Sequence, residues 1–387
     1  MTLDIARLRA ETPGVDRVLH LNHAGSSLLS AATLAGIEAQ FRREAELGSM
    51  EAGAAAAGAI DAARADIATL IGAAGDEIAF TGGNSDGWGR AFAALRLRPG
   101  DRVLVGRSEW GGNLACLERA GLAVETVPAD EHGQISLEAL AGLLDERVRL
   151  LALTWAPANG GLIQPAAAVG RLVRAVGVPY FIDAAQIVGQ MPVDVAELGC
   201  DVLVAPARKH LRGPRGVGFA YVRRDFAERL DPAFVDTRSA PIGPGGALLQ
   251  PGARRLESAE CAPALRIGFG LAVRHALDLG VDPIRAAIAA RAESLRARLA
   301  ALPGVTLCDL GVERSGLVAF TLDGWSGPRA QAALASQKIN IGFNGRAYTP
   351  LDMDARGLAE VLRASVSYLT TEAELDRFTA ALAALAA

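Results

Sequence analysis

The chain has 387 residues, a net charge of −4, 51% hydrophobic residues and 21% charged residues. This length can bury a full hydrophobic core and accommodates more than one domain. The slight acidic excess argues against a nucleic-acid-binding protein and against attachment to an anionic membrane surface. Only two of the 39 basic residues are lysines, Lys209 and Lys338, so any site that needs a side-chain amine must use one of them.

The four cysteines, at positions 116, 200, 261 and 308, show no Cys-x-x-Cys spacing. We therefore expect neither a disulfide framework nor a structural zinc site, and reduced thiols favour the cytoplasm. The first residues lack the basic and apolar segments of a secretory signal, and no apolar run is long enough to span a membrane. The sequence predicts a soluble cytoplasmic protein without membrane or nucleic-acid partners.

Predicted elements alternate between strand and helix along the first two thirds of the chain. Two Ala-rich helices between residues 30 and 72, broken near Gly48, come first. Short apolar runs separated by helices then indicate a mainly parallel sheet covered on both faces, hence an α/β fold. The expected strands are residues 77–80, 102–105, 122–127, 150–154, 179–183, 201–204 and 217–222, and the expected helices are 86–95, 112–120, 136–144 and 166–176.

The last third predicts a smaller α+β unit. Residues 236–252 are rich in Pro and Gly and are expected to form a loop, and long helices follow from about residue 265 to 302. Strands are expected at 305–310, 316–322, 339–343 and 361–368, with helices at 328–337 and from 371 onward. We expect an N-terminal arm (1–20) that packs with the small domain, a large cofactor-binding domain (21–265) and a small C-terminal domain (266–387).

The segment Thr81–Gly89, TGGNSDGWG, joins a predicted strand to a predicted helix. Asn84 or Ser85 can cap this helix, and the glycines let backbone N–H groups approach an anion at its positive end. An ordinary helix cap is the alternative interpretation. The spacing matches neither the dinucleotide-binding glycine motif nor a P-loop.

Two further segments place polar side chains at strand ends, where ligands bind in open α/β sheets. Asp183 ends an apolar strand, with Gln186 three residues on, so it either caps the next turn or faces a ligand cation. Lys209 follows another apolar strand between Arg208 and His210, and cationic neighbours favour the neutral amine that a Schiff base requires. A solvated basic turn is the alternative for Lys209, but Arg serves that purpose elsewhere in this chain. Lys338 has the ordinary position of a cation at a helix end.

An anion cradle, a carboxylate for a pyridinium nitrogen and an amine within one α/β domain point to pyridoxal 5'-phosphate. From LNHAGSS at residue 21 to LRASVSYLTTEAELDRF at residue 362, the chain resembles the group V aminotransferases of the fold-type I pyridoxal phosphate enzymes. That family includes cysteine desulfurases, isopenicillin N epimerase and a C–S lyase of ergothioneine biosynthesis. FIDAAQIVGQ (181–190) and ARKHLRGPRGVG (207–218) are the most specific matching pieces.

The resemblance implies a homodimer that acts on an amino acid, and it implies a role for each matching residue. Lys209 would bind the cofactor covalently, Asp183 would pair with the ring nitrogen, and Gln186 would approach the ring hydroxyl. Asn84, Ser85 and Arg208 would hold the phosphate, and Arg363 would bind the substrate carboxylate, a task that suits its bidentate geometry. His23 and Arg346 are further candidate substrate contacts.

Departures from the desulfurase pattern limit the range of reactions that we expect. Trp110 stands where desulfurases stack a His on the cofactor ring, Pro206 replaces a phosphate-binding Ser or Thr, and Ala158 replaces an Asn, with Asn159 next to it. Desulfurases also carry a persulfide-forming Cys ahead of the carboxylate-binding Arg, whereas residues 339–363 contain none.

The leading hypothesis is therefore β-elimination from a cysteine-derived or similar β-substituted amino acid, without persulfide relay. Transamination or epimerisation is the alternative. A catalytically idle binding module is a second alternative, which the joint presence of Lys209, Asp183 and Arg363 disfavours.

Overall fold

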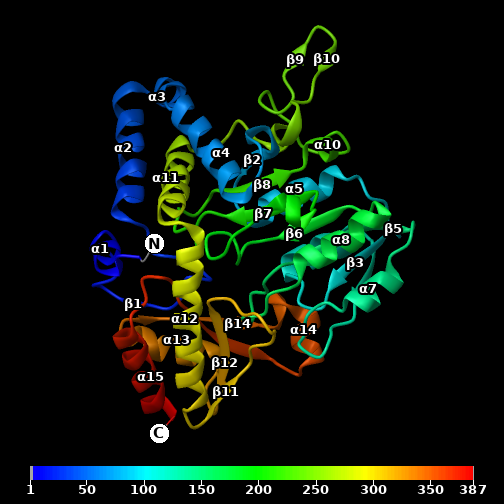
Figure 1. Cartoon of the computed structure of the whole chain (residues 1–387). Coiled ribbons are helices and arrows are strands. Elements are labelled where there is room, and N and C mark those ends of the chain that lie inside the picture. The colour runs from blue at the N-terminus through cyan, green and yellow to red at the C-terminus, as the bar shows by residue number, and fades with distance from the viewer. Residues whose placement is uncertain (1–2, 387) are drawn as a thin grey trace.

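The computed structural model describes residues 3–386, and a seven-stranded sheet forms the centre of its larger part (Figure 1). The strand order is β2-β8-β7-β6-β5-β3-β4, and the five strands from β7 to β4 run parallel. β8 pairs antiparallel with both β2 and β7. The mainly parallel α/β fold is thus confirmed. The strands are β2 (Ile78–Thr81), β3 (Arg102–Gly106), β4 (Ala123–Val127), β5 (Val148–Thr154), β6 (Tyr180–Asp183), β7 (Val202–Pro206) and β8 (Gly218–Val222).

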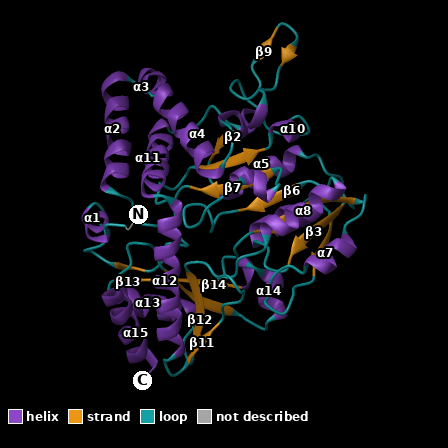
Figure 2. Cartoon of the chain, viewed as in Figure 1, coloured by secondary structure: helices purple, strands orange, loops and turns teal. Residues whose placement is uncertain are grey.

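Helices cover both faces of this sheet (Figure 2). Successive side chains of a strand point to opposite faces, so Leu151 and Leu153 of β5 enter one hydrophobic core while Leu150 and Ala152 enter the other. All four are buried. The helices in this part are α5 (Asn84–Ala94), α6 (Gly111–Arg119), α7 (Leu137–Leu143), α8 (Ala166–Val176), α9 (Val195–Leu198) and α10 (Arg224–Ala227).

The Ala-rich N-terminal region forms three helices rather than the expected two: α2 (Ala31–Leu47), α3 (Ser49–Ala55) and α4 (Ala57–Ile71). The break near Gly48 is confirmed, since this residue has φ of 92° between α2 and α3. α11 (Pro263–Leu279) lies against α2 and α4 (Figure 1). Small residues allow this approach, because a Cβ at Gly270 would lie 2.4 Å from the Cβ of Ala63.

The C-terminal part holds a four-stranded antiparallel sheet in the order β11-β12-β15-β14. The expected strand at 339–343 is split into two short strands, and α14 lies in a segment for which no element was predicted. The elements are α12 (Val281–Ala300), β11 (Val305–Leu307), β12 (Leu317–Leu322), α13 (Gly327–Ser336), β13 (Ile339–Asn340), β14 (Gly342–Gly345), the 3-10 helix η3 (Arg346–Tyr348), α14 (Pro350–Ala355), β15 (Glu360–Ser365) and α15 (Glu372–Ala386).

The N-terminal residues contact this C-terminal part. β1 (Leu19–His20) pairs in parallel with β13. Arg9 in α1 (Ile5–Ala10) donates to Leu369 O at 2.7 Å and forms an ion pair with Glu374 at 2.9 Å. The domain boundaries at residues 20 and 265 stay a prediction, and residues 1, 2 and 387 of the predicted arm and small domain lie outside the described residues.

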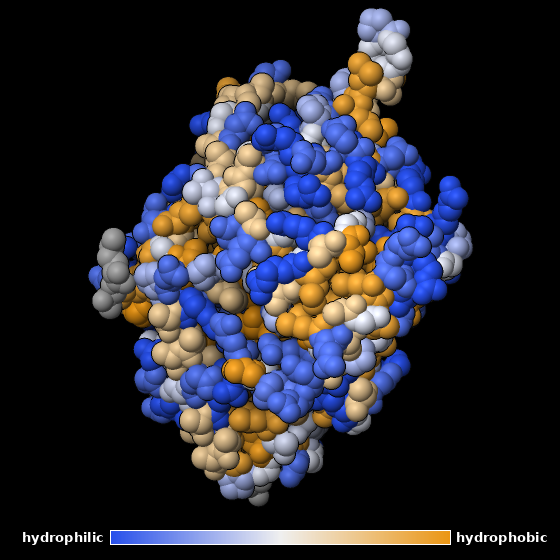
Figure 3. Space-filling view, turned by 45° about the vertical axis from the view of Figure 1, so that its right-hand side comes forward, coloured by the Kyte–Doolittle hydropathy of each residue, from blue (hydrophilic) through white to orange (hydrophobic). Residues whose placement is uncertain are grey.

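Where a loop was expected at 236–252, a hairpin of β9 (Ile242–Gly243) and β10 (Gly246–Ala247) projects from the molecule (Figure 1). Apolar side chains lie along its stem (Figure 3), with Ile242 83% and Leu248 61% exposed. The 3-10 helix η2 (Gly252–Leu256) returns the chain to the body. None of the helices between residues 3 and 386 has the length and apolar character needed to cross a lipid bilayer.

Candidate active site

Two neighbouring strand ends bring Asp183 and Lys209 to one edge of the large sheet. Asp183 is the last residue of β6, and Lys209 follows the end of the adjacent β7 by three residues. Asp183 Oδ1 accepts a hydrogen bond from Ala185 N at 3.0 Å, so it does cap the next turn. Its Oδ2 accepts from the side-chain amides of Asn84 at 2.8 Å and Asn113 at 3.2 Å. Amide donors on both sides hold the carboxylate in one orientation.

Lys209 is half-buried, and desolvation of its amine lowers the pKa to about 7. The negative charge of Asp183 opposes this effect, whereas the positive charges of Arg208 and Arg363 add to it. Burial is therefore the main cause, rather than the neighbouring cations that the sequence suggested. A substantial fraction of this amine is neutral near pH 7, as nucleophilic attack and proton transfer require.

The glycine-rich segment before α5 presents backbone N–H groups, but its capping differs from the expectation. α5 begins at Asn84, and no side chain caps its first turn. Instead, Asn84 donates to Asp183, and Asp86 Oδ2 accepts from Gly82 N at 2.8 Å. Gly83 has φ of 147°, a conformation that favours glycine. The start of this 11-residue helix is left open toward an anion.

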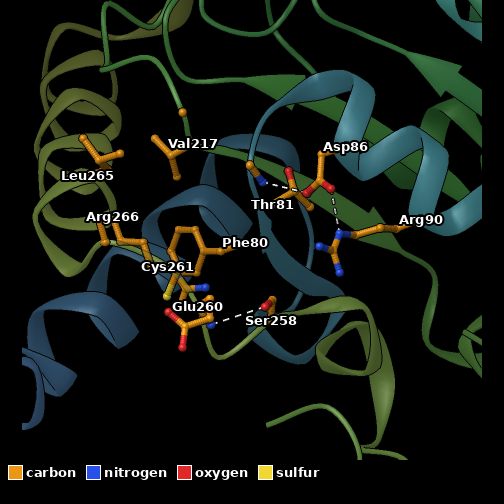
Figure 4. A pocket seen from close by; sticks show the side chains of 13 residues that line it. Phe80, Thr81, Asp86, Arg90, Val217, Ser258, Glu260, Cys261, Leu265 and Arg266 are labelled. Atoms are coloured by element: carbon orange, nitrogen blue, oxygen red, sulfur yellow. Dashed lines mark hydrogen bonds and ion pairs between the residues drawn. The ribbon is translucent and has the colours of Figure 1, made fainter. Parts of the chain in front are cut away.

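Cavities lie beside this segment. One of about 300 Å³ is lined by Thr81, Gly82, Cys261 and Arg266, and Figure 4 shows Asp86 bonded to both Gly82 and Arg90 at its border. Ser85 is exposed and lines a different cavity of about 350 Å³. The structure thus places Ser85 apart from the hydrogen-bonded group around Asp183.

The segment that follows β1 joins the loops of the large sheet to β15. Gln186 donates to Ala24 O at 3.1 Å, and Ala24 N donates to Ser365 at 2.8 Å. Arg208 is half-buried and donates to Gly25 O, and burial, followed by the charge of Arg215, lowers the pKa of its guanidinium. Gln186 and Arg208 therefore lie in one network with the N-terminal segment.

Arg363 reaches the same region from β15. It is 7% exposed and donates to Ala158 O. Burial lowers its pKa to about 10, Tyr348 opposes this shift and Arg208 adds to it. A guanidinium with this pKa keeps its charge at neutral pH and suits a carboxylate.

Two aromatic rings border this region. Trp110, directly before α6, and Tyr348 of η3 have ring centroids 5.5 Å apart and ring planes tilted by 53°. The chain segments are close, because a Cβ at Gly111 would lie 2.0 Å from Ala347 O. Trp110 is half-buried and Tyr348 is 43% exposed.

Three other residues that the sequence analysis named as candidates or alternatives for the site form hydrogen bonds or ion pairs with other parts of the protein. His23 is buried, bonds Ser27 at 2.9 Å and lines a small cavity of the N-terminal region. Arg346 is exposed and pairs with Asp354. Asn159 donates to Asp352 at 2.9 Å.

The sequence analysis missed Glu109, Asn113 and Thr154, which form a buried group behind Asp183. Thr154 ends an apolar strand, as Asp183 does, so the same strand-end rule could have found it. Glu109 and Asn113 had no comparable signal, because a polar pair at a helix start is common.

A lysine and a carboxylate at neighbouring strand ends, beside a glycine-rich helix start, are what is expected of a pyridoxal phosphate enzyme of fold type I. The profile of the family "Aminotransferase class-V" matches residues 19–378, and the chain belongs to this family. The predicted resemblance is confirmed: the chain is a pyridoxal phosphate-dependent enzyme.

Curated relatives include a lyase and desulfurases. A probable hercynylcysteine sulfoxide lyase of Mycobacterium tuberculosis is 33% identical over 98% of this chain and 93% of its own length. A cysteine desulfurase of Pectobacterium carotovorum is 29% identical over 99% and 98%. Among solved structures, a cystine C–S lyase in complex with its product cysteine persulfide has a TM-score of 0.86 at 26% identity, covering 96% of this chain and 99% of that one.

The residues present fit pyridoxal phosphate. Within residues 3–386, several buried polar atoms of this region have no hydrogen-bond partner: Asn22 Oδ1, Asn84 Oδ1, Gln186 Oε1 and Arg363 Nε. Unpaired buried polar atoms are costly, so their gathering around one lysine indicates a polar ligand. The open start of α5 would be the place for its phosphate.

Proposed function

We propose that this enzyme is a C–S lyase that performs β-elimination on an S-substituted cysteine or a similar β-substituted amino acid. The observation that carries the proposal is the absence of any thiol in the segment leading to Arg363. Residues 339–363, which form β13 through β15, contain no cysteine. A relay that stores sulfur as a protein persulfide needs a thiol there, whereas elimination does not.

The four cysteines lie in other parts of the structure. Burial raises the pKa of the thiols of Cys116, Cys200 and Cys308, which disfavours the reactive thiolate. Cys261 is exposed and lines the cavity of Figure 4 with Glu260. The names of two relatives, a sulfoxide lyase and a cystine lyase, also support lyase chemistry.

When bound, pyridoxal phosphate stabilises negative charge on the carbon next to the substrate amine. Arg363 binds the substrate carboxylate, and Asp183 keeps a proton on the ring nitrogen. The amine of Lys209, with its pKa near 7, accepts the proton from Cα. Trp110 and Tyr348 cover the site and limit the entry of water.

The electron pair left at Cα then forms the Cα–Cβ double bond, and the C–S bond breaks with its electrons on sulfur. The sulfur group leaves as an anion and takes up a proton. Released 2-aminoacrylate reacts with water to give pyruvate and ammonia. No oxidant or reductant is needed.

Product analysis tests this proposal. Holoprotein incubated with an S-alkylcysteine sulfoxide should release equal amounts of pyruvate and ammonia. Lys209→Ala should abolish release, and Lys338→Ala, which removes the other lysine from an exposed position, should retain it. Alanine with a protein-bound persulfide from free cysteine would contradict the proposal, as would dependence on a 2-oxoacid, or racemisation without elimination.

A further inference from the structure

A second buried carboxyl group, Glu109, lies behind Asp183. It is in the turn between β3 and α6 and is 1% exposed. The charge of Asp183 acts on it, and the hydrogen bonds that it accepts come from neutral groups, Asn113 and Thr154. A buried carboxyl without a cationic partner is costly and calls for a specific role.

The hydrogen bonds of Glu109 lead to Asp183 through one amide. Glu109 Oε2 accepts from Thr154 N at 2.7 Å, and Oε1 accepts from the Thr154 hydroxyl at 2.9 Å. Asn113 Nδ2 donates to Glu109 Oε1 at 2.8 Å and to Asp183 Oδ2 at 3.2 Å. An amide nitrogen has two hydrogens in a fixed plane. Bonding one of them to Glu109 directs the other at Asp183.

We propose that Glu109 is a positioning residue for the cofactor: through Asn113 it orients the carboxylate of Asp183, and its negative charge helps to keep the ring nitrogen protonated. The inference rests on the proposed role of Asp183 opposite that nitrogen. It does not depend on which bond of the substrate is broken afterwards.

The charge of Glu109 changes at pH values near neutrality. Burial raises its pKa to about 7, hydrogen bonds from Asn113 and Thr154 oppose the shift, and the charge of Asp183 adds to it. The titratable groups facing Glu109 are Asp183 and Tyr180, both on β6, while α6 and β5 contribute the neutral Asn113 and Thr154. Above pH 7 the site therefore holds two carboxylates, and the negative potential at the ring is larger.

A pH titration of the absorbance of the bound cofactor, without substrate, tests the inference. Glu109→Gln removes the charge, so the midpoint between the protonated and unprotonated forms should move to lower pH by about one unit. Loss of the support that Glu109 gives to Asp183 should also weaken cofactor binding about tenfold. Glu118→Gln, on the exposed side of α6, should change neither quantity.

Two further variants separate charge from positioning. Glu109→Asp keeps the charge but shortens the side chain, so it should retain the midpoint while weakening cofactor binding. Asn113→Ala breaks the link to Asp183 and should weaken binding about tenfold; it also tests the inference if Glu109→Gln does not fold.

An unchanged midpoint and unchanged cofactor affinity in Glu109→Gln, with only a lower melting temperature, would show that Glu109 is merely structural. That result would leave the lyase proposal intact, because wild-type product formation is measured separately. A wild-type protein that takes up no cofactor would overturn both.

Discussion

At the scale of single residues, Glu257 is a buried carboxylate with several arginines around it. Its Oε1 accepts from Arg64 at 2.6 Å and from Phe80 N at 3.0 Å, and its Oε2 accepts from Arg238 at 3.0 Å. Burial raises its pKa, but the charge and hydrogen bond of Arg64, the charge of Arg266 and the hydrogen bond from Phe80 N together outweigh burial and leave the pKa below its usual value. Its contribution to stability is thus complete above the unfolded-state pKa and is lost as the pH falls through the lower folded-state pKa.

We predict that Glu257→Gln lowers the free energy of unfolding by about 3–5 kcal/mol at pH 7, because it leaves buried Arg64 without its counter-ion. Urea unfolding measures this change. Asp354→Asn is the matched control: it removes a carboxylate from the exposed pair with Arg346 and should leave the unfolding midpoint unchanged. Equal midpoints for both variants would contradict the prediction.

Some residues of the site could be predicted from the sequence, and others could not. Lys209 could be predicted because lysine is so scarce, and Asp183 because it interrupts an apolar run at a strand end. The burial that lowers the pKa of Lys209 comes from segments distant in the sequence, so its size could not be predicted. Glu109 follows β3 and Asp183 ends β6, and the two come close only because β5 pairs with both strands, which no local pattern reveals.

At the scale of elements, the turn after β6 determines where the Lys209 loop lies. Gly189 in that turn has φ of 92°, and a Cβ there would lie 2.7 Å from Leu211 N and 2.8 Å from the carbonyl carbon of His210. Gly177 at the end of α8 has φ of 70° but has open space around it. Both glycines have a positive φ that would strain any residue with a Cβ, but only Gly189 contacts the loop that carries Lys209.

We predict that Gly177→Ala costs about 1–2 kcal/mol of stability and keeps full cofactor content. Gly189→Ala should cost more and should reduce the cofactor bound per chain, since the loop that carries Lys209 must shift. Absorbance of purified protein and urea unfolding measure both quantities. Equal cofactor content in the two variants would refute the link between this turn and Lys209.

Elements with strong local patterns were predicted well, and those defined by packing were not. α8 was predicted at its observed bounds, 166–176, because its apolar residues recur with helical spacing. The split between α3 and α4 falls at Ala56 itself, an alanine in a run of alanines between Gly53 and Gly58, and β9 and β10 are too short to show a strand pattern.

At the scale of the whole molecule, the site combines segments from every part of the chain: the N-terminal segment at Ala24, the ends of β6 and β7, and β15 with Arg363. Exposed apolar side chains remain on α2, α3 and the β9–β10 hairpin, including Phe41 at 50%, Met50 at 83% and Ile242 at 83%. Such surfaces suit association between proteins. They support the homodimer predicted from the family resemblance, which stays a prediction.

The central claim is that Lys209 alone carries pyridoxal phosphate. Borohydride reduction of the holoprotein, followed by digestion and mass spectrometry of the peptides, tests it most directly. The account predicts that the cofactor mass is attached to the peptide containing Lys209 and is absent from the peptide containing Lys338. Cofactor on Lys338, or yellow holoprotein whose reduced Lys209 peptide is unmodified, would contradict it.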